Sequence, residues 1–209
     1  MNTEKYFHGS PKKFDKFSAE FCGKTTGHEQ YGSGFYFTTD RDEARGYAGE
    51  NGYVFEVALS LSSTMIVPFS NSEEDKGNDP LTSKQIEDMI VHAPESRDSL
   101  WNYGDIDYVG YESVLNSAVK SYCGMNPLSA MNALGNDFYR DQEAEVLKNI
   151  KKFIGVDSIL IEKNRGVKHI VVFDPVDISI TSVSRNIEIK KRKDPQVDDD
   201  NTPSSRIKI

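Results

Sequence analysis

The sequence predicts an α+β fold, because β-type segments occupy both ends of the chain and helix-type segments fill its middle. Runs of β-branched and aromatic residues lie before residue 60 and again after residue 157. Between about residues 82 and 153, apolar residues recur at the spacing of a helix instead. We therefore expect the two sets of strands to share a sheet system, with the helices packed on one side of it or forming a lobe.

The first third of the chain is predicted to be mostly extended. An aromatic strand is followed by a helix-like segment that carries Tyr47. Asn51 and Gly52 form a pair typical of a tight turn, and they lead into a strand rich in aromatic and β-branched residues. The extended segments are 6–10, 34–39, 53–59 and 60–68, and residues 69–80 form a polar loop.

The middle of the chain is predicted to hold four helices. Thr82 is the expected N-cap of a helix over residues 83–92, which Pro94 stops. Asp137 is the expected N-cap of the last helix, which ends at Phe153 before Gly155. The two helices between them cover 108–122 and 127–134, and residues 95–106 are expected to be irregular.

The last third of the chain returns to strands and ends in a charged tail. Apolar β-type runs at 158–162 and 169–173 flank a turn signal and predict a hairpin, and 178–183 predicts one more strand. A basic block at 190–193 and an acidic block at 198–200 cannot bury enough apolar surface to order themselves. The sequence thus predicts a domain over residues 1–185 and a flexible tail over 186–209, either solvated or used for docking.

Composition argues against several classes of protein. Asp and Glu number 33 against 25 Lys and Arg, a net charge of −8, which disfavours a protein that holds duplex nucleic acid. No apolar run is long enough to cross a membrane, and the N-terminus carries no export signal. Cys22 and Cys123 form neither a disulfide framework nor a zinc spacing. We therefore expect a cytoplasmic protein with reduced thiols and no membrane partner.

Two short motifs could bind an aromatic amide and a sugar. His8 offers a hydrogen-bond donor and an acceptor at the end of a strand, and Gly9 lets a ligand approach its backbone closely. Tyr36 and Tyr47 come from adjacent elements and can clamp a flat ring between their faces. The simpler interpretation is a solvated turn and two core tyrosines. Together, however, the four residues suit an aromatic carboxamide with a ribose, such as nicotinamide riboside.

The order of these motifs resembles the His-Tyr-Glu class of ADP-ribosyltransferases, which includes diphtheria toxin and the poly(ADP-ribose) polymerases. The sequence is especially similar to the ADP-ribosyltransferase domains of phage and mobile-element polyvalent proteins. These share an HGSP…FDKF start, a YGxGLYF strand and a final VVFDP strand, which match residues 8–17, 31–37 and 171–175 here. The likeness covers about residues 5–59 and 157–180. It implies a split β-sheet core with a helical insert at about 82–153.

The resemblance implies that NAD is the substrate and that no metal is needed. His8 would hold the adenosine ribose, Gly9 would bond the nicotinamide carboxamide through its backbone, and Tyr36 and Tyr47 would sandwich the nicotinamide ring. Two further residues complete the NAD-binding set implied by the motifs, namely Ser10 and Arg45, the latter beside a pyrophosphate. A solvated helix charge is an equally good interpretation of Arg45.

The sequence departs from the family pattern at two positions. Counting back from the VVFDP motif puts His169 where the family has a catalytic glutamate, which stabilises the cation formed as nicotinamide leaves. Glu162, on the partner strand of the hairpin, could supply that carboxylate instead. Ala44 stands where many members have a serine that bonds the carboxamide, and the missing hydrogen bond should weaken NAD binding by roughly 0.5–1.5 kcal/mol.

The resemblance implies a mono-ADP-ribosyltransferase that modifies a macromolecule, expected to be a protein, and releases nicotinamide. The setting it implies is a phage or mobile-element effector or toxin that acts in the cytoplasm of a bacterial host. Two alternatives stay open. One is the same fold with weak or no catalysis, used as a binding module, and the other is an NAD glycohydrolase toxin that transfers ADP-ribose to no acceptor.

Overall fold

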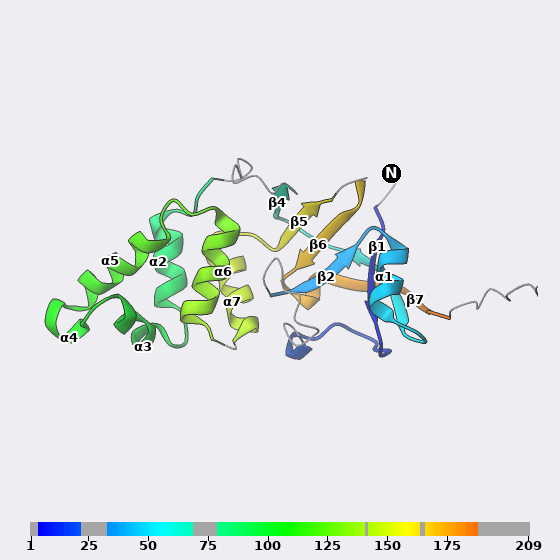
Figure 1. The fold of residues 1–209 in the computed structure, drawn as a ribbon, viewed down its shortest axis with the longest axis horizontal. Helices are drawn as coiled ribbons and strands as arrows, with labels where there is room; N and C mark the ends of the chain where they lie inside the picture. Colours follow the sequence, from blue (N-terminus) through cyan, green and yellow to red (C-terminus); the bar gives the residue numbers. More distant parts are fainter. Residues whose placement is uncertain (1–3, 22–32, 69–78, 141, 164–165, 188–209) are drawn as a thin grey trace, which may run out of the picture.

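The computed structural model of this chain describes residues 4–21, 33–68, 79–140, 142–163 and 166–187. Figure 1 shows strands gathered in one part of the molecule and most of the helices in the other. No helix within the described ranges has the length and apolarity needed to span a bilayer. The arrangement confirms the α+β class, with the helices grouped at one end of a sheet.

Seven strands form one mixed sheet in the order β4-β5-β6-β2-β1-β3-β7. Strands from both ends of the chain share this sheet, as the sequence predicts. All neighbouring strands run antiparallel except β4 and β5, which are parallel. The strands are β1 Tyr6–Ser10, β2 Phe35–Thr38, β3 Tyr53–Leu59, β4 Thr64–Pro68, β5 Ser158–Glu162, β6 Lys168–Val172 and β7 Ile178–Arg185.

The junction between β1 and β2 is the weakest pairing in the sheet. All five residues of β1 pair with β3, but β1 pairs with β2 only where Phe7 lies opposite Thr38. β2 in turn pairs with β6 along its whole length, from Phe35 to Thr38. The sheet therefore consists of two well-paired halves that meet at one position, and the strands are unpaired with each other on either side of it.

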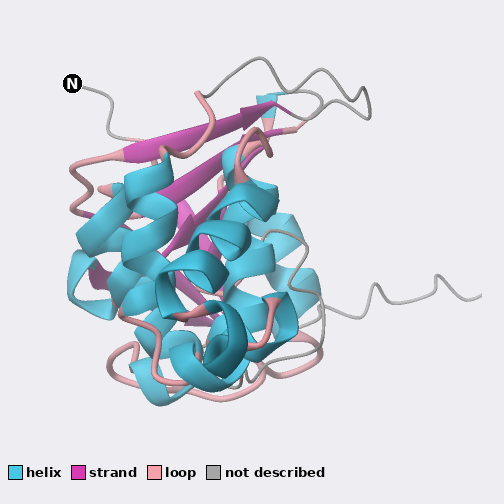
Figure 2. Cartoon of the chain, turned by 90° about the vertical axis from the view of Figure 1, so that its left-hand side faces the viewer, coloured by secondary structure: helices cyan, strands magenta, loops and turns pink. Residues whose placement is uncertain are grey.

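One helix lies against the first strands, and the others follow one another between β4 and β5. Figure 2 shows this second group in front of the sheet when the molecule is viewed from the helical end. Thr82 caps α2 through a full capping box with Gln85, as predicted for the cap. The helices are α1 Arg41–Ala48, α2 Ser83–Val91, α3 Ser96–Leu100, α4 Ile106–Val109, α5 Tyr111–Tyr122, α6 Pro127–Phe138 and α7 Glu143–Asn149.

Several predictions about the helical part were wrong. Asp137 lies inside α6 instead of capping a helix, and its carboxylate accepts hydrogen bonds from the hydroxyls of Tyr103 and Tyr122. The predicted helix 108–122 is broken at Gly110, which has a positive φ of 86°. Residues 95–106 are not irregular, since they contain α3 and a 3₁₀ turn.

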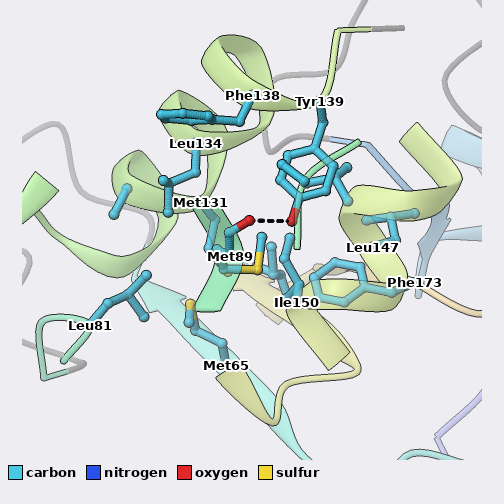
Figure 3. Close-up of a cluster of buried hydrophobic side chains, with 14 of the residues drawn as sticks. Met65, Leu81, Met89, Met131, Leu134, Phe138, Tyr139, Leu147, Ile150 and Phe173 are labelled. Atoms are coloured by element: carbon cyan, nitrogen blue, oxygen red, sulfur yellow. Dashed lines mark hydrogen bonds between the residues drawn. The ribbon is translucent and has the colours of Figure 1, made fainter. Parts of the chain in front are cut away.

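A continuous apolar core joins the helices to the sheet. Figure 3 shows Met65 of β4 and Phe173, which follows β6, beside side chains of α2, α6 and α7. Tyr139, which is 1% exposed, donates a hydrogen bond of 2.7 Å from its hydroxyl to the backbone carbonyl of Met89. The polar group of this large side chain is thus satisfied where water does not reach, and it ties the end of α6 to α2.

Candidate functional site

A side chain bridges the weak junction between β1 and β2. The Nδ1 atom of His8 lies 2.9 Å from the backbone oxygen of Tyr36. Because a carbonyl can only accept, Nδ1 carries the proton, and Nε2 of the neutral ring keeps a lone pair that can accept a hydrogen bond. Within the described part of the chain, no group bonds Nε2. The sequence therefore places an available acceptor at the edge of the open junction.

Aromatic rings fix the orientation of the His8 imidazole. It packs against Phe14, Phe17, Phe37 and Phe55, with ring centroids 5.2–6.2 Å apart. Burial in these apolar surroundings lowers the pKa of His8, and the hydrogen bond to the Tyr36 carbonyl opposes that effect only in part. The ring is thus held neutral and rigid, in the form that leaves Nε2 as an acceptor.

Gly9 allows α1 to lie directly on β1. A Cβ atom at this position would stand 1.9 Å from the backbone oxygen of Ala44 and 2.7 Å from the backbone nitrogen of Ala48. Ala44 and Ala48 are almost fully buried and form a small apolar cluster with Phe7 and Val54. The glycine that the sequence assigns to ligand contact therefore also fixes the helix that carries Tyr47.

The two flanks of α1 face opposite ends of the sheet. On one flank Arg41 donates to the Ser184 hydroxyl of β7 at 3.0 Å, and on the other Glu43 reaches Thr38 of β2. Tyr47 lies four residues after Glu43 and so shares its flank, on the side of β2 and β6. Asp40 caps the helix by accepting hydrogen bonds from the backbone N–H groups of Asp42 and Glu43, and it therefore sets where α1 begins.

His169 and Glu43 form a polar cluster on the face of the sheet that α1 covers. Thr38 lies directly opposite His169 in the β2–β6 register. The Oε2 atom of Glu43 is 2.6 Å from both the Thr38 hydroxyl and the His169 Nε2 atom, and the Lys163 ammonium lies 3.6 Å from Oε1. Burial alone would raise the pKa of Glu43, but the hydrogen bonds and nearby positive charges outweigh it and hold that pKa below its ordinary value.

Tyr36 and Tyr47 belong to this same region. Tyr36 lies two residues before Thr38 on β2 and therefore shares its face of the sheet. The Tyr47 side chain is 62% exposed, and it makes no ring contact with another described aromatic side chain. Tyr36 is partly buried against the main core. The structure thus brings Tyr36 and the Tyr47 flank to one face without stacking their rings on each other.

Ser10 and Glu162, two further predicted site residues, lie at the ends of β1 and β5. Ser10 ends β1, and its hydroxyl accepts a hydrogen bond from the backbone N–H of Lys12 at 3.2 Å. Glu162 is exposed on β5 and adjoins Ile161, which pairs with His169, so alternation turns the Glu162 side chain to the opposite face from His169. The carboxylate of Glu162 therefore lies on the other face of the sheet from His169.

Arg45 lies on the flank of α1 that faces away from Tyr47. Its guanidinium pairs with Asp42 at 2.6 Å, and both side chains are largely exposed. With Arg41 and Arg185 it lines an open groove of about 770 Å³ between α1 and the β3–β7 edge. The groove gathers three cations in a chain whose net charge is −8, so it is suited to an anionic group.

Glu43 is the site residue that the sequence reasoning missed. It stands next to Ala44 in the helix and one turn before Tyr47, so its position on the Tyr47 flank follows from helical spacing. Its contact with His169 depends on the pairing of β2 with β6, which joins residues 126 positions apart in the chain. Only that long-range pairing reveals a carboxylate beside position 169.

The α+β architecture with its seven-stranded mixed sheet is consistent with an ADP-ribosyltransferase domain. The family model described as "ADP-Ribosyltransferase in polyvalent proteins" matches residues 3–187. The chain therefore belongs to the family of ADP-ribosyltransferases found in polyvalent proteins, and members of this class use NAD as a substrate. No curated protein and no solved structure matched the chain significantly.

Proposed function

We propose that this protein is a mono-ADP-ribosyltransferase that moves ADP-ribose from NAD to a macromolecular acceptor, a protein, and releases nicotinamide. The observation that carries the proposal is the geometry of the residues at the β1–β2 junction. There burial lowers the pKa of His8, its ring is oriented by the hydrogen bond to the Tyr36 carbonyl, and α1 with Tyr47 covers the other face of the same strands. Family membership supports the reaction class, and the geometry supports these residues as its NAD-binding set.

The residues at the β1–β2 junction can bind the ribose, the carboxamide and the nicotinamide ring of NAD. The Nε2 lone pair of His8 can accept a hydroxyl proton of the adenosine ribose, and the Gly9 backbone can pair with the carboxamide. Tyr36 and the exposed Tyr47 supply aromatic faces for the nicotinamide ring. His8 packs with Phe37 and Phe55, on the face opposite the α1 cluster, so NAD would have to pass through the open junction between the strands.

Ser10 and Arg45 are proposed for the phosphate-bearing part of the substrate. Ser10 ends β1 next to Gly9, and its hydroxyl can also donate. Arg45 would have to leave its exposed pair with Asp42, which costs little because such surface pairs contribute about 0–1 kcal/mol. An Arg45→Met variant should raise the Kd for NAD several-fold if this guanidinium meets the pyrophosphate, and an unchanged Kd would remove it from the site.

Transfer of single ADP-ribose units is proposed in preference to chain growth. In the related polymerases, elongation goes with the glutamate that the family pattern places at position 169, and this chain has histidine there. The product expected on the acceptor is therefore one ADP-ribose per modified side chain. Mass spectrometry of modified acceptors should find a single added unit, and longer adducts would overturn this part of the proposal.

The experiment that tests the function is incubation of the protein with labelled NAD and a bacterial lysate. We expect label on macromolecules, release of nicotinamide, and loss of both in a Tyr36→Ala variant. Tyr111→Ala, which removes a ring that is 36% exposed on α5, is the control and should retain nicotinamide release. Nuclease and protease treatment of the labelled fraction would distinguish nucleic-acid from protein acceptors.

Two observations favour a second candidate, a binding module with little or no catalysis. Position 169 carries no carboxylate of its own, and Ala44 offers no hydroxyl to the carboxamide. Thermal stabilisation by NAD without label and without nicotinamide release would support the module. Nicotinamide release without labelled acceptors would instead support an NAD glycohydrolase.

The proposed setting is a phage or other mobile element, with the protein acting as an effector in the cytoplasm of a bacterial host. Membership of a family found in polyvalent proteins supports this setting. Expression in a bacterial host should slow growth, and the Tyr36→Ala variant should relieve the effect. Equal growth with both proteins would argue against a toxin role.

A further inference from the structure

We propose that Glu43 supplies the catalytic carboxylate that the family places at position 169, and that His169 and Thr38 position it. This inference rests on the proposed function, since it concerns the same site. It assigns the negative charge to a residue on α1, a different element from the strand β6 that carries position 169. His169 then becomes a positioning residue.

The hydrogen-bond pattern leaves one carboxylate oxygen of Glu43 available. Its Oε2 atom accepts from both the Thr38 hydroxyl and the His169 Nε2–H, each at 2.6 Å. Among the residues that the structure describes, the Oε1 atom has only the Lys163 ammonium nearby, at 3.6 Å, which is beyond a good hydrogen bond. One oxygen thus fixes the side chain while the other can face a ligand.

Exposure distinguishes Glu43 from His169 as the group that meets substrate. The Glu43 side chain is 28% exposed, whereas that of His169 is 10% exposed. His169 donates its Nε2–H to Glu43 and is paired with Thr38 across the strands, so its ring is held between β2 and α1. The histidine is therefore placed to hold the carboxylate, and the carboxylate is the more accessible of the two.

The position of Glu43 along the helix brings it to the tyrosines. It lies one turn before Tyr47 on the same flank of α1, and its partner Thr38 lies two residues after Tyr36 on β2. Ala44 and Ala48 pack directly on Gly9, which fixes the distance between this helix and the sheet. The carboxylate is consequently held close to the two aromatic residues proposed to contact nicotinamide.

The reaction calls for a fixed negative charge at this point. In NAD the bond from ribose C1′ to the nicotinamide nitrogen breaks with both electrons going to nitrogen, so neutral nicotinamide leaves. The ribose keeps the positive charge as an oxocarbenium ion, until an acceptor nucleophile adds to C1′ and loses its proton to solvent. An ionised Glu43 stabilises this cation, whereas the imidazole of His169 carries no negative charge and cannot.

The test is the rate of nicotinamide release from saturating NAD by Glu43→Gln, with the Kd for NAD measured separately. We expect kcat to fall on the order of 100-fold, with Kd changed less than about threefold, because the lost interaction acts on the transition state. Glu112→Gln is the matched control. It removes an exposed carboxylate from the first turn of α5, and release should stay within about twofold of the parent.

A double variant separates a lost charge from a damaged fold. Glu43→Gln with His169→Glu returns a carboxylate to the family position, and we expect it to recover at least about tenfold of the lost rate. His169→Gln, which keeps a donor for the carboxylate, should lower kcat less than Glu43→Gln does. Unchanged release in Glu43→Gln, while the parent remains active, overturns this assignment alone. A parent protein that releases no nicotinamide overturns the proposed function as well.

Discussion

At the scale of single residues, Gly9 is required for the packing of α1 on β1, in addition to the ligand contact proposed for it. The backbone oxygen of Ala44 occupies the space that a Cβ atom at Gly9 would need, at 1.9 Å. The same close approach keeps the Gly9 backbone beside the helix that carries Tyr47. The need for glycine here follows from the packing of α1 on β1, whether or not a ligand is bound.

Replacement of Gly9 by alanine should therefore destabilise the fold. We expect Gly9→Ala to lower the free energy of unfolding by about 3 kcal/mol, because a backbone oxygen cannot move aside as a side chain can. Gly46→Ala is the control, since nothing lies within 4 Å of its added Cβ. It should stabilise α1 by about 0.5–1 kcal/mol. Urea unfolding measures both changes, and equal stability of the Gly9→Ala variant and its parent would refute this packing.

His8 should make stability depend on pH. Its pKa in the folded protein lies below the ordinary value of 6.5, so below that pH the unfolded chain binds a proton that the folded protein does not. The free energy of unfolding should therefore fall between pH 7 and pH 5, by at most ~1.4 kcal/mol per pH unit from this group. Denaturation at both values should reveal a smaller loss for His8→Gln. The same loss in both proteins would mean that His8 stays accessible to protons.

Much of the candidate site could be predicted from the chain because its motifs are local. His8 and Gly9 are neighbours on one strand, and the separation of Tyr36 from Tyr47 spans one strand and one helix. Glu43 could not be predicted in the same way. Its role depends on His169, which reaches it only after β6 pairs with β2. Local patterns therefore yield the binding motifs, and long-range pairing is needed for the carboxylate.

At the scale of elements, the strands were easier to predict than the helix boundaries. Runs of β-branched and aromatic residues placed extended segments at all seven strands, although the segment over β4 was predicted from residue 60 and the strand begins at Thr64. Helix α6 was predicted to end at Leu134, but the helix continues to Phe138. An added Cβ at Gly135 would lie 3.5 Å from a methyl group of Val146, an ordinary van der Waals contact, so this part of α6 packs against α7. Tertiary packing outweighed a weak local signal.

The hydrogen bonds of Tyr139 should hold the helical part together. Its hydroxyl donates to the Met89 carbonyl and accepts from the Asn149 amide at 2.9 Å. Tyr139→Phe would leave both groups short of a partner in the core, so we expect a loss of about 1–3 kcal/mol in unfolding free energy. Tyr108→Phe is the control, because Tyr108 is 87% exposed and should change stability by less than about 0.5 kcal/mol. Equal effects of the two substitutions would contradict the buried network.

At the scale of the whole molecule, the helices and the sheet share one apolar core. The core runs from the strands through α2, α6 and α7. Deleting part of the helical region would therefore unfold the protein, and surface substitutions are the better probe of its role. Figure 1 shows α4 at the end of the helical group farthest from the sheet.

Exposed aromatic residues at that end should influence acceptor choice. Trp101 is 45% exposed and Tyr108 is 87% exposed, and neither lies on the elements at the β1–β2 junction. A Trp101→Ser, Tyr108→Ser double variant should change the pattern of labelled proteins in a lysate. Its release of nicotinamide from NAD alone should stay within about twofold of the parent. An unchanged labelling pattern would exclude these two residues from acceptor binding.

The most direct test of the account is a crystal structure of the protein with an NAD analogue that cannot release nicotinamide. We predict that the nicotinamide ring lies between Tyr36 and Tyr47, with its carboxamide on the backbone of Gly9 and the nicotinamide ribose facing Glu43. Nicotinamide bound elsewhere, such as in the groove lined by Arg41, Arg45 and Arg185, with the β1–β2 junction closed, would contradict it.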